Sequence, residues 1–386
     1  MPWDADRGIY NLEICRALLP QHEVRAVAPI PWLDEVKARR PGRPALPPGR
    51  VTVLEGVWVG YPRYFYIPKV LRRLYGTFLW HSIRRFLRNS LADFRPDIVL
   101  GYWAHPDGAV AVRYARSVGA RVWIMVGGSD VLLLARHGVR RRLILDALRG
   151  ADGVMPVSRN LRERLVEMGL PGSRIVPFSR GVDRERFGLG PRDEARRRLG
   201  LPPGVPLLLW VGRLVPVKGL DVLVTACSRL QAEAPGLQVL LAGSGPLRAA
   251  LEAQARQAGV AGMIRFLGSV RHEELGEWFR AADAVVLPSL SEGVPNVLLE
   301  GHACGVPFVA SAVGGVSEAA LSGIDRLVPP GDADALASAI LATLHAPRPD
   351  PAMLAASVPG LADAGNRLIR ILSAETCAGD GATQLL

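Results

Sequence analysis

Two glutamates flank the start of a predicted helix in the second half of the chain. Glu292 lies in a Gly/Pro-rich turn after a strand that ends at Leu287, and Glu300 lies one to two turns into a helix that begins near Pro295 or Asn296. A helix N-terminus presents free backbone N–H groups and the positive end of the helix dipole, so it can bind a diphosphate. Glu300 could then accept hydrogen bonds from a ribose, and Glu292 from a sugar. For either glutamate alone, the favoured interpretation is a solvated side chain without function. The whole sequence of residues 288–300 disfavours that interpretation for the pair.

Arg213 and Lys218 lie five residues apart in a loop that joins a predicted strand, residues 207–211, to a helix. Cations at the carboxyl end of a strand can neutralise a departing diphosphate. Each charge-assisted hydrogen bond contributes roughly 1.5–3 kcal/mol. The alternative is a pair of surface cations without function, which Pro216 and Gly219 disfavour because they shape a tight loop.

Short apolar runs alternate with helical patterns along the whole chain. The strand candidates are residues 98–100, 122–126, 153–157, 207–211, 238–242, 264–267, 284–287 and 307–310. Continuous apolar runs separated by helices indicate parallel sheets covered on both faces. The sequence therefore predicts an α/β fold of two doubly wound, Rossmann-like domains. We expect a first domain over residues 1–180, a second over 181–372, and a disordered tail over 373–386.

The opening of the first domain departs from this pattern. The chain starts at what resembles the Gly-rich turn of Arg7-Gly8, followed by a predicted helix over residues 9–19 and a strand over 24–28. A doubly wound domain usually opens with a buried strand before such a turn. We therefore expect the first strand of this domain to be missing.

The charge is uneven: +14 over residues 1–180 and −3 over residues 181–386. A basic half suggests nucleic acid, an anionic membrane or phosphorylated substrates as partners. No signal peptide and no apolar run long enough to span a bilayer is present in these 386 residues. The four cysteines, which have no paired spacing, argue against a zinc site or a disulfide framework and fit a reducing, cytoplasmic compartment.

Taken together, these strings resemble the family 4 retaining glycosyltransferases of the GT-B fold, in which two Rossmann-like domains face each other. Further matching strings are 159–187, 243–247, 266–268, 282–283, 303–307, 314–318 and 328–332. The resemblance implies donor-site roles for Glu292, Glu300, Arg213 and Lys218. It places the nucleotide base near Phe266 and adds Gly8, Gly212, Gly293, Asn296 and Val297 as donor-binding residues.

Within the family, the chain looks most like bacterial teichuronic-acid and exopolysaccharide transferases, on the strings 63–69 and 103–108. On the acceptor side the candidates are Tyr102, Asp107, Asp130 and His105. Tyr102 stands where relatives often have His, and His105 is a candidate catalytic residue in its place, with a structural histidine as the alternative. The implied reaction moves a sugar from a nucleotide-diphosphate sugar to a lipid-linked glycan acceptor.

No cofactor and no metal are expected. Asp4-Ala5-Asp6 and Asp332-Ala333-Asp334 imitate an Asp-x-Asp metal motif, but the favoured interpretation is turn and capping residues. Gly243-Ser244-Gly245 is only part of a dinucleotide fingerprint, which argues against NAD.

Residues 61–89 carry seven cations, no acidic residue and eight aromatic side chains, seven of them interleaved with the cations. Such a stretch can lie on an anionic membrane surface, with a solvated helix face as the alternative. Nucleic acid is not an expected partner, because no recognised module accompanies the basic stretch. We expect a cytoplasmic protein bound peripherally to the inner face of the plasma membrane.

Two other functions remain open at this point. One is a degenerate, non-catalytic scaffold that binds sugar nucleotides, suggested by the missing strand and by altered loops. The other is a nucleotide-sugar epimerase of the same fold. The complete set of two glutamates and two cations favours the transferase.

Overall fold

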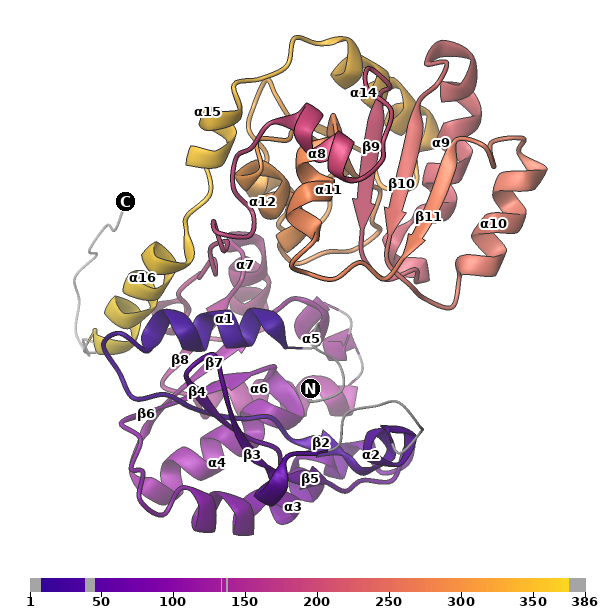
Figure 1. Ribbon diagram of the computed structural model, residues 1–386. Helices are drawn as coiled ribbons and strands as arrows, with labels where there is room; N and C mark the ends of the chain where they lie inside the picture. The colour runs from indigo at the N-terminus through magenta and orange to yellow at the C-terminus, as the bar shows by residue number, and fades with distance from the viewer. Residues whose placement is uncertain (1–7, 39–45, 133, 137, 375–386) are drawn as a thin grey trace. The chain divides into compact units, whose positions relative to one another are not determined.

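The computed structural model describes residues 8–38, 46–132, 134–136 and 138–374 of the chain (Figure 1). The chain divides into two compact units. Unit 1 comprises residues 1–179 together with 362–386, and unit 2 comprises Arg180–Leu361. The expected second domain extended to residue 372, and this limit is wrong, because the last helix packs in unit 1. The expected tail lies almost entirely outside the described residues.

Unit 2 is built on one parallel six-stranded sheet in the order β11-β10-β9-β12-β13-β14. Its strands are β9 (Leu207–Val211), β10 (Gln238–Ala242), β11 (Ile264–Gly268), β12 (Ala284–Leu287), β13 (Phe308–Ser311) and β14 (Arg326–Val328). Its helices are α8 (Arg192–Arg198), α9 (Leu220–Glu233), α10 (Arg248–Gln257), α11 (Leu275–Ala281), α12 (Asn296–Ala303), α13 (Val316–Ala319), α14 (Ala333–His345) and α15 (Pro351–Ala356). The central strands are buried along almost their whole length, as continuous apolar runs predict.

The order of the strands creates a switch point between β9 and β12. From β9 the chain adds β10 and β11 on one side, then returns to β12 on the other side. Consecutive crossovers thus diverge from β9, so the loops after β9 and β12 lie next to each other at the carboxyl ends of these strands. Open α/β sheets bind ligands at such a point.

Unit 1 contains three smaller sheets in the part of the chain that the structure describes. One pairs β1 (Arg25–Val27), β4 (Val57–Gly60) and β3 (Val51–Leu54), and one pairs β2 (Ile30–Pro31) with β5 (Arg63–Tyr64). The third is parallel, with β6 (Ile98–Tyr102), β7 (Arg121–Val126) and β8 (Gly153–Pro156) in that order. β1 and β6 are edge strands of separate sheets, and no described strand joins them; residues 1–7 lie outside the described part.

Helices surround these sheets. They are α1 (Ile9–Leu18), α2 (Trp32–Ala38), α3 (Tyr75–Ser90), α4 (Ala109–Val118), α5 (Ser129–Leu132), α6 (Gly138–Arg149), α7 (Arg159–Glu167) and α16 (Leu361–Ser373). The last helix lies beside the first (Figure 1), where Gln21 Nε2 donates to Asn366 Oδ1 at 3.1 Å. Gly365 permits this approach, because a Cβ there would lie 2.8 Å from the Ala17 carbonyl oxygen. None of the described helices is both long and apolar enough to cross a bilayer.

All eight predicted strands form, with ends that differ by at most two residues. The predicted first helix and the strand after it also form, as α1 and β1. Asp332 caps α14 by accepting from the backbone N–H groups of Asp334 and Ala335, which confirms the capping interpretation of that Asp-x-Asp string. Asp4-Ala5-Asp6 lies outside the described residues.

Candidate functional site

The loops after β9 and β12 are locked together at the switch point by their backbones. Leu290 N donates to the Val217 carbonyl oxygen at 2.8 Å. Gly219, with φ +61°, passes so close to the other loop that a Cβ would lie 2.0 Å from the Pro288 carbonyl oxygen. Glycine is therefore required at this position both for the left-handed backbone and for the approach.

An ion pair joins the two loops through their predicted functional side chains. Lys218, in the short helix η6 (Pro216–Lys218), places Nζ 2.6 Å from Glu292 Oε1. The exposed fractions of the two side chains are 23% for Lys218 and 11% for Glu292. The two residues were predicted to contact different parts of one ligand, and the structure brings them into direct contact. A ligand that carries negative charge can compete with Glu292 for the ammonium group.

Two other positive features lie on the same loops. Arg213 follows Gly212 directly after β9 and is exposed to solvent. Helix α12 begins at Asn296 and continues through Val297, and no side chain caps its N-terminus at Pro295. The first turn therefore keeps backbone N–H groups available to an anion.

A neighbouring turn, Gly314-Gly315, supports the loop of Glu292 from the side of β13. Gly315 N donates to the Gly293 carbonyl oxygen at 2.7 Å. Gly314 has φ +55°, and a Cβ there would lie 2.0 Å from the Glu292 carbonyl oxygen. The sequence carried these glycines only as part of a resemblance, without a role; a Gly-Gly pair just after a buried strand was the available sign.

Glu300 lies in α12 and is almost fully buried, with 2% of its surface exposed. Its Oε1 lies 3.7 Å from Nε2 of His272, a residue that sequence reasoning missed. The His272 ring packs edge-on against Phe187, with ring centroids 5.0 Å apart. A ribose could therefore reach Glu300 only after neighbouring side chains move.

The loops after β10 and β11 complete this edge of the sheet. A Cβ on Gly243 would lie 1.7 Å from the Gly212 carbonyl oxygen, so the loop after β10 touches the loop that carries Arg213. Phe266, in β11, is partly buried, and the guanidinium carbon of Arg248 lies 5.7 Å from its ring centroid. Arg248 thus adds a cation beside the position expected for the base.

The acceptor-side candidates lie in unit 1, in and after β6 and β7. Tyr102 ends β6, and His105 and Asp107 follow in the turn that leads to α4. Asp130 is 1% exposed. Its carboxylate accepts from Gly128 N at 3.0 Å and from Ala104 N at 3.3 Å, so it fixes the turn rather than facing a ligand.

Burial changes the proton affinities of two of these groups. Desolvation raises the pKa of Asp107 to about 6. Desolvation and the nearby Arg140 lower the pKa of His105 to about 4, so the imidazole is neutral at pH 7. Near neutral pH this turn therefore offers one carboxylate and one neutral histidine.

Gly8, the predicted remnant of a donor loop, is exposed with φ +96° and precedes α1 in unit 1. Its carbonyl oxygen accepts from Asn11 N and Leu12 N, each at 3.0 Å, and so begins the helix. The other residues that were predicted to bind the donor belong to unit 2. Among the residues that the structure describes, no group of three or more His, Cys, Asp or Glu side chains could hold a metal ion.

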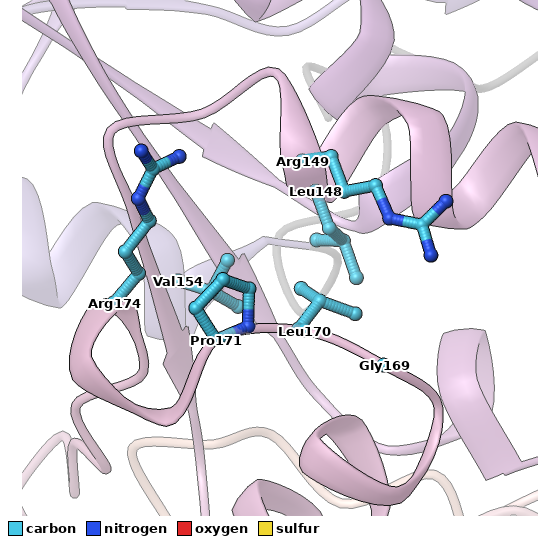
Figure 2. A pocket seen from close by; sticks show the side chains of 7 residues that line it. All are labelled: Leu148, Arg149, Val154, Gly169, Leu170, Pro171 and Arg174. Carbon is cyan, nitrogen blue, oxygen red and sulfur yellow. The ribbon is translucent and has the colours of Figure 1, made fainter.

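Figure 2 shows a cavity in unit 1 that is separate from these groups. It has a volume of about 180 Å³ and lies where the loop of residues 169–174 passes α6 and β8. Leu148, Val154, Leu170 and Pro171 line it, together with Arg149 and Arg174. The lining holds no carboxylate or histidine, so this cavity lacks the groups that the predicted chemistry requires.

Two family models match the chain. The model described as "Glycosyltransferase Family 4" matches residues 8–186, and the model described as "Glycosyl transferases group 1" matches residues 205–346. Between them they cover most of both units.

The curated relatives include proteins of two kinds. The chain is 28% identical over 325 residues to the "Putative teichuronic acid biosynthesis glycosyltransferase TuaC" of Bacillus subtilis, covering 82% of this chain and 78% of that protein. It is 37% identical over 209 residues to "D-inositol 3-phosphate glycosyltransferase 2" of Catenulispora acidiphila, covering 52% of this chain and 45% of the relative. The chain thus spans a little under half the length of this relative.

Solved structures with a similar fold include sucrose-phosphate synthase from Thermosynechococcus elongatus, with a TM-score of 0.73, 24% identity, and coverage of 95% of this chain and 89% of the other. Another is HepE of Anabaena in complex with UDP and glucose, with a TM-score of 0.74, 16% identity, and coverage of 97% of each chain. At these identities the likeness shows the fold alone: two Rossmann-like domains of the GT-B type.

The contact of Gly314 with Glu292 generates a prediction. In Gly314→Ala the new Cβ would displace the turn of Glu292, so we expect nucleoside-diphosphate affinity to fall at least fivefold in calorimetry. Gly331→Ala is the matched control, because Gly331 also has a positive φ, +82°, but open space around it. Equal affinities of the two variants, both folded by circular dichroism, would contradict a positioning role for this turn.

Proposed function

The chain belongs to glycosyltransferase family 4, and on that premise we propose that it transfers a sugar, with retention of configuration, from a nucleotide-diphosphate sugar to a glycan acceptor. The observation that carries this proposal is the pairing of Lys218 with Glu292 at 2.6 Å, at the switch point and close in sequence to the uncapped start of α12. One loop thus supplies a cation for a leaving diphosphate, and the next a carboxylate for the sugar.

The charge layout supports departure of the diphosphate without a metal ion. Arg213, Lys218 and the backbone N–H groups at the start of α12 can stabilise negative charge as the sugar–phosphate bond breaks. The sugar then becomes oxocarbenium-like, and the carboxylate of Glu292 positions and stabilises it.

Retention follows if the departing phosphate takes the proton of the acceptor hydroxyl on the same face of the sugar. This route needs no enzyme nucleophile. Asp130 is an unsuitable nucleophile because its buried carboxylate already accepts from two backbone N–H groups. Asp107 is assigned here to the acceptor.

The acceptor that we propose is a lipid-linked glycan in envelope or exopolysaccharide synthesis. Support comes from the similarity to TuaC, whose name refers to teichuronic acid biosynthesis, over most of both chains. A glycan on a lipid carrier requires an enzyme that works at a membrane surface, and unit 1 carries a surface suited to this.

This surface, which we call the basic apolar loop, comprises residues 63–73. Phe65, Ile67, Val70 and Leu71 are exposed large apolar side chains in it, and Phe65 is 56% exposed. Arg63, Lys69, Arg72 and Arg73 are exposed cations of the same loop. No acidic residue occurs from Gly56 to Ala92. Arg63 is paired with the buried Glu35 at 2.8 Å. Apolar side chains among the other exposed cations match the interface of an anionic bilayer.

The basic apolar loop is held firmly although its side chains are exposed. Trp32 Nε1 donates to the Tyr66 carbonyl oxygen at 2.8 Å, and the Trp32 and Phe65 rings stack with centroids 5.5 Å apart. Phe65 N donates to Ser82 Oγ of α3 at 3.1 Å. Because the loop is already ordered, it can present its apolar side chains and cations to a membrane without first folding. We therefore include peripheral binding at the cytoplasmic face of the plasma membrane in the proposal.

A non-catalytic scaffold that binds sugar nucleotides is the second candidate. Asp130 favours it, because this acceptor-side candidate is 1% exposed and its carboxylate already accepts from two backbone N–H groups. Both functions require binding of the sugar nucleotide, but only the transferase transfers the sugar.

The principal experiment measures the reaction course with a panel of nucleotide sugars and a lipid-linked acceptor. The anomeric configuration of the product, read from NMR coupling constants, should match that of the donor, and excess EDTA should leave the rate unchanged. Glu292→Gln should cut turnover by at least 100-fold without trapping a covalent sugar, whereas Glu318→Gln on α13 is the control.

Each outcome has a distinct meaning. An inverted product overturns the mechanism, and a trapped glycosyl-enzyme overturns the role of Glu292. Strict dependence on a divalent ion overturns the metal-independent site. Binding of donor without transfer from any member of the panel supports the scaffold.

Asp107 should give the acceptor step a pH dependence. We assign its ionised carboxylate to a hydroxyl of the acceptor, so kcat/KM for the acceptor should rise as pH increases through about 6, the raised pKa of this group. Asp107→Asn should abolish this rise of kcat/KM with pH and increase the acceptor KM about tenfold. Asp97→Asn is the control and should leave the rise unchanged.

The same group gives a check on stability. Because folding raises the pKa of Asp107 from its ordinary value of 3.8 to about 6, ionisation of this group costs stability as pH rises through that range. The Asn variant should therefore gain stability relative to the natural protein above pH 6 in urea titrations. If the pH profile of kcat/KM for the acceptor were unchanged in Asp107→Asn, this residue would have no place in the acceptor site.

The basic apolar loop should direct binding to anionic vesicles. Phe65→Ser/Ile67→Ser should weaken sedimentation with phosphatidylglycerol vesicles at least fivefold, and Arg72→Gln/Arg73→Gln should weaken it mainly at low salt. Val166→Ser is the control, because Val166 is 41% exposed on α7, away from the loop in sequence. Equal binding of all variants, or equal binding to neutral and anionic vesicles, would contradict the proposal.

A further inference from the structure

We propose that unit 2 has a second anion site, for a small phosphate-bearing molecule, at the edge of the sheet opposite the donor loops. It is formed by Arg192, Arg196 and Arg348 around Asp283. The proposal is independent of the proposed function, because it rests on none of the donor residues.

The cluster has more positive than negative charge. Asp283 Oδ1 lies 2.6 Å from Arg192 Nη1, and Asp283 Oδ2 lies 2.9 Å from Arg196 Nη2. Arg348 Nη1 approaches Asp283 Oδ1 only to 3.9 Å. The other carboxylate at the cluster, Asp193, lies 3.6 Å from Arg192 Nε and is 77% exposed, so solvent screens it.

Donors also outnumber acceptors. Asp283 accepts from Leu207 N at 2.8 Å in addition to the two arginines. Arg196 Nε is occupied by the Ala281 carbonyl oxygen at 2.9 Å. Three guanidinium groups carry about fifteen N–H donors. Most of those on Arg192 and Arg348 remain for an anion that replaces solvent.

Arg348 is held where positive charge is unfavourable for it. It stands between Pro347 and Pro349, which restrict the backbone on both sides. Desolvation lowers its pKa, and the neighbouring Arg192 lowers it further. An anion would relieve this repulsion, and the rigid backbone reduces the entropy lost on binding.

A cavity of about 230 Å³ opens beside these side chains. Its lining includes the three arginines, Asp283, residues 204–206 and Ala346. It is smaller than the roughly 300–1,000 Å³ of drug-sized ligand pockets, which favours a phosphate or diphosphate group over a whole nucleotide. Arginine forks match the oxygens of such groups.

The cavity lies at the amino ends of the strands. Leu207 begins β9, Asp283 precedes β12, and Pro307, which also lines the cavity, precedes β13. The donor loops follow the carboxyl ends of β9 and β12. Strands of four to five residues, at about 3.3 Å per residue, separate the two edges by about 15 Å.

The test is calorimetric titration of the full-length chain with inorganic phosphate and, separately, acetate. Arg213→Ala/Lys218→Ala is the background, because it removes the cations by which the donor site would take phosphate. In this background Arg192→Ala and Arg348→Ala should each weaken phosphate binding at least tenfold. Arg197→Ala, an exposed cation of the same helix α8, is the matched control and should change it less than twofold.

Three outcomes would overturn the site: no phosphate binding in the background protein, equal losses in Arg197→Ala and Arg348→Ala, or acetate binding as tightly as phosphate. Arg196 is left intact, since its buried guanidinium supports the fold. Unfolding curves of each variant separate loss of the site from loss of structure.

Discussion

Close backbone contact at the carboxyl edge of the unit 2 sheet is the constraint on which the functional geometry depends. Gly219 lies against Pro288, Gly243 against Gly212, and Gly314 against Glu292, each at a distance that a Cβ would not permit. Hydrogen bonds from Leu290 N to Val217 O and from Gly315 N to Gly293 O fix the relative orientation of these loops. Rigid loops can hold side chains in place before a ligand arrives, and such preorganisation is the main source of electrostatic stabilisation in active sites.

The Lys218–Glu292 pair is the chemical counterpart of this constraint. Neither side chain is fully exposed, so an unpaired charge at either position would be costly. Pairing lets the proposed donor site exist without ligand while Lys218 and Glu292 cancel each other's charge. It also places opposite charges on adjacent loops, in contact at 2.6 Å.

Much of this could be predicted from the sequence, because parallel sheets and their loops leave local patterns. The predicted strands of unit 2 are mostly apolar runs, and Arg213, Lys218 and Glu292 each follow such a run closely. The contact between Lys218 and Glu292 could not be predicted, since it depends on which strands are neighbours. His272 and Arg348 were missed for the same reason: each lies in a loop, and only the tertiary fold brings it to Glu300 or Asp283. The hairpin of β3 and β4 and the placement of α16 in unit 1 likewise depend on long-range packing.

The ion pair also suggests how donor chemistry could proceed without a metal under the proposed function. A diphosphate brings two or more negative charges, whereas Lys218 is already neutralised and Arg213 supplies one positive charge. As the sugar–phosphate bond breaks, negative charge grows on the phosphate and positive charge on the sugar. The first attracts Lys218 and the second attracts Glu292, so the charges that the reaction creates can replace those that the pair gives up. Lys218 and Glu292 then stabilise the separating phosphate and sugar more than they stabilise the intact donor. Such a difference is the condition for accelerating a reaction rather than only binding its substrate.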